Sequence, residues 1–131
     1  RLSLFGEADA VFSSDVYVGH GAGAEGWVEL AQAGSTLSAY SLQVGYNGKG
    51  HLVLRDGATI RATNVTHIGC LAGAQGEATI SGAGTKLDTA VIGVGYSGKG
   101  SLTVENGAEI GQLRYVGYNS GAEGIVVLSG G

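Results

Sequence analysis

The heptapeptide VGYNGKG at residues 44–50 returns as VGYSGKG at residues 94–100, fifty positions further along the chain. The residues that follow return as well, since LVL and DGATI at 52–60 correspond to LTV and NGAEI at 102–110. A fixed period of roughly 20–50 residues is the signature of a solenoid, in which like segments stack on like.

A shorter period lies inside this one, because an apolar residue followed by glycine recurs every 22–26 residues. These pairs are Val18-Gly19, Val44-Gly45, Ile68-Gly69, Val94-Gly95 and Val116-Gly117. A second type of unit, marked by GAEG or GAQG at 23–26, 73–76 and 121–124, alternates with the Gly-Lys-Gly type. We therefore predict about five coils of 22–26 residues, in alternating types, with a 50-residue double repeat.

Within each coil, apolar residues alternate with others at a period of two, which indicates strands rather than helices. The pairs expected to point inward from the first strand are Val28/Leu30, Leu52/Leu54, Ala78/Ile80, Leu102/Val104 and Val126/Leu128. Two further short strands per coil are separated by Gly, Asn, Asp and Ser turns. One such coil cannot bury its apolar face alone, so the coils must stack.

The fold class that follows is all-β, a parallel β-helix (β-solenoid), and the family resemblance described below implies that it is right-handed. An antiparallel sandwich is the rival, but identity at a period of fifty residues favours a ladder of equivalent positions. We expect residues 1–131 to form a single β-solenoid segment. The chain starts at Arg1 and stops within the repeat pattern, so we also expect it to be a fragment of a longer protein.

Composition narrows the class of protein. Glycine accounts for 26 of 131 residues, yet 44% of the residues are hydrophobic and only 14% are charged, which argues against disorder. The net charge is −4, and the seven basic residues are scattered, so neither a nucleic-acid footprint nor a polybasic membrane patch is expected. The single cysteine, Cys70, cannot form an internal disulfide.

Alignment of the coils predicts three columns of stacked side chains. The first column follows the apolar-Gly pairs and contains His20, Tyr46, Cys70, Tyr96 and Tyr118. The second lies in the third strand and contains Val16, Leu42, Thr66, Ile92 and Arg114. The third is charged and contains Glu25, Lys49, Gln75, Lys99 and Glu123. We expect Tyr96 and Tyr118 to stack directly. Thr66 and Arg114 interrupt an otherwise apolar column, and the sequence does not explain them.

No catalytic, cofactor-binding or metal-binding residue is predicted. The GAGAEG segment at 21–26 matches G-x-G-x-x-G, but a strand-like segment follows it instead of the helix that holds a dinucleotide pyrophosphate. His20, His51 and His67 fall in different columns, so they are expected to be surface residues rather than metal ligands. Neighbouring coils rarely place two carboxylates in one column, which disfavours a glycosidase-like pair.

The two units together, with VGYxGKGxLxVxxGAxI at 94–110 and GAEGxVxLxxAGSxL at 23–37, resemble the passenger-domain repeats of autotransporters. These are surface proteins that Gram-negative bacteria secrete by the type V route. The resemblance covers residues 16 to 131. It implies a right-handed β-helix stalk, export through the outer membrane by a barrel outside this chain, and adhesion to host cells or to other bacteria.

From this resemblance we expect a non-enzymatic structural or adhesive segment, secreted or exposed at the cell surface. Its partners would be protein or glycan molecules on host or bacterial surfaces, and its open ends would allow end-to-end self-association. No nucleic-acid partner and no cofactor are expected. The alternative is a carbohydrate-active β-helix enzyme or a tailspike-like polysaccharide-binding protein.

Overall fold

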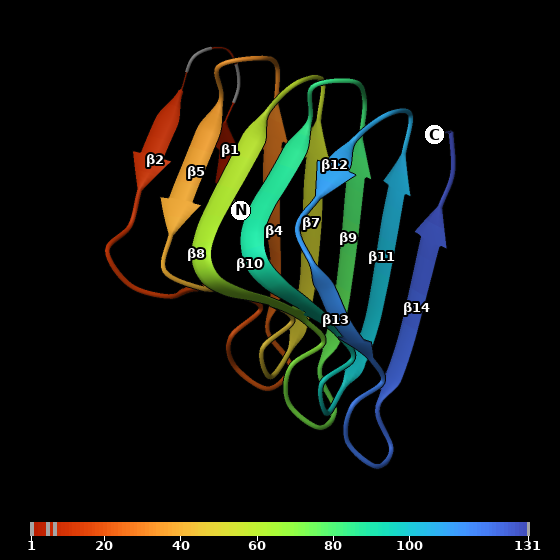
Figure 1. The fold of residues 1–131 in the computed structure, drawn as a ribbon. Helices are drawn as coiled ribbons and strands as arrows, with labels where there is room; N and C mark the ends of the chain where they lie inside the picture. Colours follow the sequence, from red (N-terminus) through yellow and green to blue (C-terminus); the bar gives the residue numbers. More distant parts are fainter. Residues whose placement is uncertain (1, 5, 7, 131) are drawn as a thin grey trace.

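The structure is a computed structural model that describes residues 2–4, 6 and 8–130. Its described residues form strands and turns without a helix, and the strands lie in two parallel sheets (Figure 1). The first sheet contains β1 (Leu2–Leu4), β4 (Glu25–Ala31), β7 (Lys49–Arg55), β9 (Gln75–Ser81), β11 (Lys99–Glu105) and β14 (Glu123–Leu128). The second contains β2 (Asp9–Val11), β3 (Val16–Val18), β5 (Thr36–Ala39), β6 (Leu42–Val44), β8 (Thr59–Ile68), β10 (Lys86–Val94), β12 (Glu109–Ile110) and β13 (Leu113–Val116).

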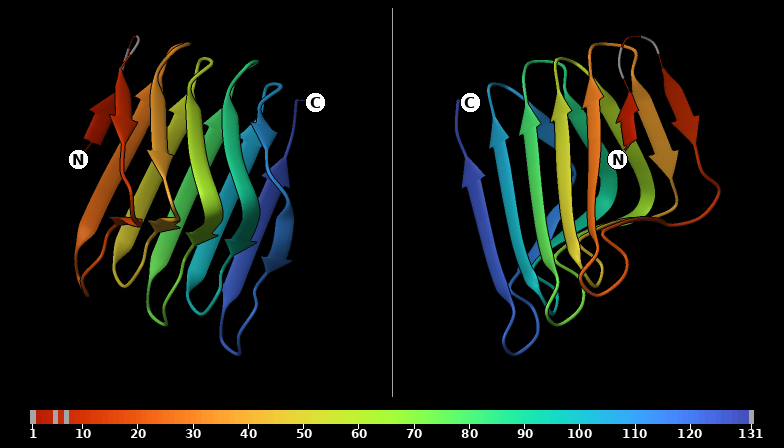
Figure 2. Two further views of the ribbon diagram at one scale, coloured as in Figure 1. Left: turned by 60° about the vertical axis from the view of Figure 1, so that its left-hand side comes forward. Right: turned by 180° about the vertical axis from the view of Figure 1, so that it is seen from behind.

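The chain winds as a right-handed solenoid of about five turns, as predicted. In Figure 1 it ascends in the rear sheet, crosses over the top, descends in the front sheet and advances to the right with each turn. The two views in Figure 2 show the same two layers with their strands in chain order along the axis. Right-handed crossovers between parallel strands are the general rule, because twisted strands pack back onto the sheet in that sense.

The strand register follows the sequence repeat throughout the first sheet. Leu30 pairs with Leu54, Leu54 with Ile80, and Ile80 with Val104. The first three of these side chains are fully buried, and so are Leu37, Ile60 and Leu87, which face them from the second sheet. The inward set predicted from the period of two therefore forms the core between the sheets as far as Val104; in the last coil Val126 is partly buried and Leu128 is exposed.

The two unit types differ at the corner between the first and second strands. In one type, Ser35 or Thr85 occupies the inner corner position, and its hydroxyl donates to the carbonyl four residues earlier, at 2.7 Å for Ser35 to Ala31. In the other type the equivalent residue is Ala58 or Ala108. A hydroxyl corner thus alternates with an alanine corner, one of the differences that give the sequence a period of fifty residues rather than twenty-five.

The predicted division of every coil into three strands is only partly right. In the two central coils the second and third strands are continuous, and β8 and β10 bend instead of breaking (Figure 1). Pairing between them shifts register at the bend, between Thr89 and Val91. The bend therefore turns the chain without a glycine turn, which is why the turn signals in the sequence did not mark it accurately.

The position predicted for Arg114 in the third-strand column is wrong. Ile92 pairs with Leu113, and the next pair is Gly93 with Tyr115, so Arg114 is the extra residue of a β-bulge. A bulge leaves one residue outside the ladder and re-aims its side chain. The apolar column is thus continued by Leu113, and Arg114 is exposed.

Thr66 does lie in that column, fully buried between Leu42 and Ile92. Its Oγ1 atom has no hydrogen-bond partner among the residues that the structure describes. We expect Thr66→Val, which keeps the shape and removes the unsatisfied hydroxyl, to raise the free energy of unfolding by about 1 kcal/mol. Denaturant titration measures the change.

The matched control is Thr85→Val, because the Thr85 hydroxyl is buried and satisfied. It donates to the Ser81 carbonyl and accepts from the Gly57 amide, each at 2.8 Å. Its removal should lower the free energy of unfolding by about 1–3 kcal/mol. If Thr66→Val were as destabilising as Thr85→Val, the Thr66 hydroxyl would have to be bonded.

Candidate functional site: an aromatic face along the solenoid

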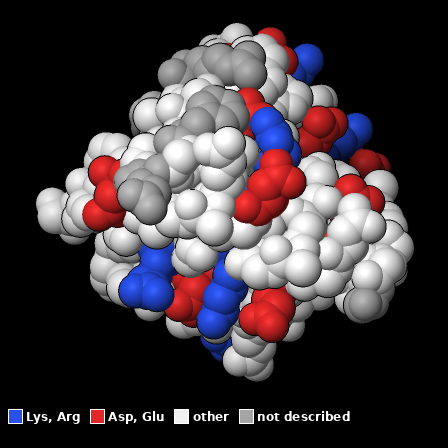
Figure 3. Space-filling model, turned by 90° about the horizontal axis from the view of Figure 1, so that it is seen from above, with Lys and Arg blue, Asp and Glu red and all other residues white. Residues whose placement is uncertain are grey.

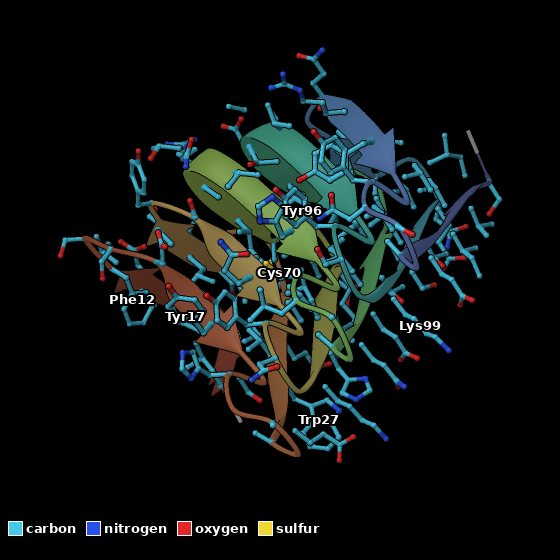
Figure 4. The ribbon with its side chains drawn as sticks, turned by 90° about the horizontal axis from the view of Figure 1, so that it is seen from below. Phe12, Tyr17, Trp27, Cys70, Tyr96 and Lys99 are labelled. Carbon is cyan, nitrogen blue, oxygen red and sulfur yellow. The ribbon has the colours of Figure 1, made fainter. Side chains whose placement is uncertain are left out.

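Seven ring-bearing side chains line one outer face of the molecule, and we call this set the aromatic face. It consists of Tyr17, His20, Tyr46, His67, Tyr96, Tyr115 and Tyr118. Viewed from below in Figure 4, Tyr17, Cys70 and Tyr96 follow one another along the solenoid, whereas Trp27 and Lys99 lie on a different side. The face spans the coils from β3 to β13.

The predicted column after the apolar-Gly pairs is confirmed. The amides of Cys70, Tyr96 and Tyr118 donate in turn to the carbonyls of Gly45, Gly69 and Gly95. The rings of Tyr96 and Tyr118 are parallel within 6°, with centroids 5.2 Å apart, as expected for adjacent coils. At the other end His20 stacks on Tyr46 at 5.3 Å.

A second column beside the first was missed by the sequence analysis. Tyr17, Gln43, His67, Gly93 and Tyr115 occupy the outward position of the third strand in successive coils. The signal was present, because Tyr17 lies between the inward residues Val16 and Val18 and therefore points outward. The turn column and the strand column meet edge to face, as in Tyr17 and Tyr46 at 4.7 Å.

The face divides into two clusters of rings, which are separated by Gln43 and Cys70. The Cys70 side chain is buried, and its Sγ atom lies 3.9 Å from Nδ1 of His67. Burial raises the pKa of the Cys70 thiol and lowers the pKa of His67, so both neutral forms are favoured. This is the opposite of a thiolate-imidazolium nucleophile, and it agrees with Cys70 filling a place in a structural column.

A groove of about 320 Å³ opens at the C-terminal cluster. It is lined by Asn64, Val65, His67, Ala90, Val91, Tyr96, Arg114, Tyr115 and Tyr118. Its volume is at the lower end of the roughly 300–1,000 Å³ of small-ligand pockets. Rings, one cation and one amide thus surround an open depression on the outer surface.

The groove exists because the fifth coil departs from the repeat. The fourth coil has four residues between Leu87 and Ile92, but the fifth has only two between their partners Ile110 and Leu113. The shortened bend leaves Ala90 and Val91 uncovered at the wall of the groove. Gly93 has no side chain, and the Tyr115 ring occupies the space where a Cβ at Gly93 would lie.

Burial raises the pKa of Tyr115 to about 12, with a smaller contribution from Tyr96 and an opposing one from Arg114. Since the folded state disfavours the phenolate, stability is complete below pH 10, the ordinary pKa, and falls as the pH rises through about 12. We expect Tyr115→Phe to reduce this alkaline loss of stability. Ultraviolet titration of phenolate absorbance should also lose its last component in the variant, and an unchanged titration curve would contradict the assignment.

The other outer face carries charged groups together with one stacked pair of rings, Trp27 on His51, with centroids 4.9 Å apart. The predicted charge column is confirmed in register, since Glu25 pairs with Lys49 and Lys99 with Glu123, whose charged atoms are 3.8 Å apart. Glu25, however, bonds His51 Nε2 at 3.1 Å, and Glu77 bonds the other ring nitrogen at 3.2 Å. Two carboxylates are thus brought to one histidine, an association that column alignment did not predict.

Positive and negative side chains are mixed elsewhere on the surface. Arg61 and Asp88 form an ion pair at 3.3 Å, and Arg55 bonds both Glu29 and Asp56. The view from above in Figure 3 shows Lys and Arg beside Asp and Glu in small groups, with uncharged surface between them. Pairing of this kind leaves no broad field of one sign on that face.

The remaining candidates from the sequence take the following places. The GAGAEG segment forms a turn that leads into β4, so a strand follows it, as expected. His20 and His67 lie on the aromatic face and His51 on the first sheet, and the described residues contain no group of three His, Cys, Asp or Glu side chains placed to hold a metal ion. No segment of the described chain forms a helix with the length and hydrophobicity needed to cross a bilayer.

Comparisons of the chain with protein-family models, with curated proteins and with solved structures find no match. The functional argument therefore rests on the geometry of the aromatic face.

Proposed function

We propose that this chain is a non-enzymatic adhesive segment of a bacterial surface protein, in which the solenoid acts as a stalk and the aromatic face binds a partner. The observation that carries the proposal is the row of rings along one side, in two clusters that combine exposed rings (Tyr17, His20 and Tyr118) with half-buried ones. Tyr17 is 41% exposed and Tyr118 is 60% exposed, although neither is needed to close the core. Exposed aromatic patches on a stable scaffold are typical of binding surfaces.

The scaffold suits such a task. Each ring is attached to a strand or to a corner whose backbone is hydrogen-bonded to the next coil, as Tyr118 is to Gly95 at 2.9 Å. Stacked rings have few accessible rotamers, so little conformational entropy is lost when a partner covers them. Resemblance of the repeats to autotransporter passengers supports secretion to the cell surface of a Gram-negative bacterium.

A binding role is favoured over a carbohydrate-active enzyme because carboxylates near the surface are engaged in ion pairs and hydrogen bonds. A glycosidase pair must be free to act on a glycosidic bond. Glu25 and Glu77 are both engaged with His51, and Glu29 and Asp56 with Arg55. The groove on the aromatic face has no carboxylate in its lining.

The test is adhesion of the fluorescently labelled chain to cultured epithelial cells and to Gram-negative bacteria. Tyr96→Ala with Tyr118→Ala should remove most of the bound fluorescence, because these rings form the largest exposed stack. Trp27→Ala removes an aromatic side chain from the first sheet and should leave adhesion unchanged. Adhesion that survives the double variant would exclude the aromatic face, and absence of adhesion to every cell type would indicate a stalk alone.

End-to-end association is a second proposal, drawn from the last coil. Ile125, Val127 and Leu128 of β14 are 61%, 47% and 66% exposed, and one edge of β14 is unpaired in the described sheet. Unpaired parallel edges with apolar side chains favour pairing with another chain. Sedimentation of the 131-residue chain should show larger species as concentration rises, and Val127→Lys should reduce them; a monomer at all concentrations would contradict the proposal.

A further inference from the structure

The geometry points to an acidic saccharide as the ligand of the groove between Tyr96, Tyr115, Tyr118 and Arg114. The inference rests on the proposed binding function and adds the chemical class of the ligand. In the arrangement that we infer, the face of a sugar ring lies on the exposed Tyr118 ring and a sugar carboxylate meets the Arg114 guanidinium.

Arg114 supplies the charge for this arrangement. It is the only charged side chain in the lining of the groove, and it forms no ion pair with a carboxylate in the described part of the chain. The other arginine on this sheet, Arg61, has such a partner in Asp88. An unpaired guanidinium in a protein of net charge −4 is a local site for an anion, and it can bind a carboxylate through two parallel hydrogen bonds.

The position of Arg114 is a departure from the repeat. The bulge places it outside the ladder, the shortened bend opens the groove beside it, and Gly93 makes room for the Tyr115 ring. In a repeat protein each coil could have kept the common pattern at no cost to the core. Three deviations that converge on one groove indicate that the groove itself is used.

The tyrosine rings supply the surface for a sugar ring. Tyr96 and Tyr118 are parallel, and Tyr115 leans against both with centroids 5.6 Å and 4.9 Å away. The negative face of an aromatic ring attracts the weakly positive C–H groups on one side of a pyranose. The Asn64 amide, which also donates to Ser41 at 3.1 Å, retains a carbonyl oxygen for a sugar hydroxyl.

Other classes of ligand fit this groove less well. An extended peptide binds by adding a strand to a free sheet edge. β8 and β10 are paired on both sides, and a peptide added to the free edge of β13 would lie beside that strand rather than in the groove. A nucleic acid needs several cations to neutralise its phosphates, and the groove offers one. A saccharide needs only side-chain contacts, stacking and one ion pair, all of which the groove contains.

The experiment is a titration of the purified 131-residue chain with an oligogalacturonate, followed by calorimetry and by two-dimensional NMR. We expect the oligogalacturonate to bind, and we expect NMR chemical-shift changes only at residues of the groove. Arg114→Gln and Tyr118→Ala should each weaken the affinity by about tenfold or more. Both side chains are exposed, and circular dichroism verifies that the variants stay folded. Arg61→Gln is the matched control and should bind as the unmodified chain does.

Two further probes separate the parts of the inference. A maltooligosaccharide of equal length has the ring without the carboxylate, and polyglutamate has the carboxylate without the ring; each should bind at least about tenfold more weakly. The inference would be overturned if either probe bound as tightly as oligogalacturonate, or if chemical-shift changes appeared outside the groove. It would also be overturned if Arg114→Gln bound oligogalacturonate with unchanged affinity. If oligogalacturonate does not bind while cell adhesion still depends on Tyr96 and Tyr118, the ligand class is wrong and the adhesive function stands.

Discussion

Gly95→Ala should destabilise the chain by at least about 3 kcal/mol, the largest effect that we expect of a single methyl group here. Gly95 has a φ of +75°, which costs an alanine roughly 1–2 kcal/mol. A Cβ at this position would also lie 2.2 Å from the carbonyl oxygen of Glu123 in the next coil. The two coils would have to separate at this corner, where the Tyr118 amide bonds the Gly95 carbonyl at 2.9 Å. Thermal and denaturant unfolding measure the loss.

Gly73→Ala separates the steric cause from the backbone cause. Gly73 has a φ of +85°, close to that of Gly95, but a Cβ there would meet no atom within 4 Å. We therefore expect it to cost only the conformational part, about 1–2 kcal/mol. Equal losses for the two variants would mean that coil contact at Gly95 contributes nothing, and that the corner glycines serve conformation alone.

Leu54→Ala should lower the free energy of unfolding by about 2–5 kcal/mol, a large part of the total stability of an ordinary domain. Leu54 is fully buried in the middle of the first sheet, between Leu30 and Ile80. Truncation leaves a cavity that the stacked coils cannot close, because every residue around it is fixed in two ladders. Denaturant titration with an unchanged slope would verify that stability, and not compactness, has changed.

Leu128 is the matched control because it occupies the same inward column in the last coil, where it is 66% exposed. At a concentration at which the chain is monomeric, Leu128→Ala should change the free energy of unfolding by no more than about 0.5–1 kcal/mol. Comparison of the two variants tests whether the contribution of a leucine to stability depends on its position along the solenoid. A loss at Leu128 as large as at Leu54 would show that the last coil is covered in solution, for example by a second copy of the chain.

The register of the solenoid could be predicted in detail from the sequence. Alignment on the apolar-Gly pairs placed Glu25 beside Lys49 and Tyr96 beside Tyr118, and both neighbours are confirmed. The reason is that a parallel stack puts each residue above its counterpart one period away. Repetition in the sequence is thus translated directly into proximity in space.

Deviations from the repeat could not be predicted in the same way. The alignment placed Arg114 in an apolar column, and only the structure showed that Leu113 takes that place. The bulge adds one residue and the shortened bend removes two, so they compensate each other in part, and the sequence alone does not say where each occurs. The groove lies at this irregularity, and for this reason it was missed.

The association of neighbouring columns was also decided by the tertiary structure. The sequence gives the order of residues within a column, but the distance between columns depends on the angle at which a corner or bend turns the chain. That angle brings Tyr17, in a strand, against Tyr46, in the turn that follows the next strand. By itself the sequence determined the solenoid, its alternating coils and its inward and outward faces, because hydrophobic period and glycine punctuation are local properties. The aromatic face and its groove arise from packing between coils, which no single repeat contains.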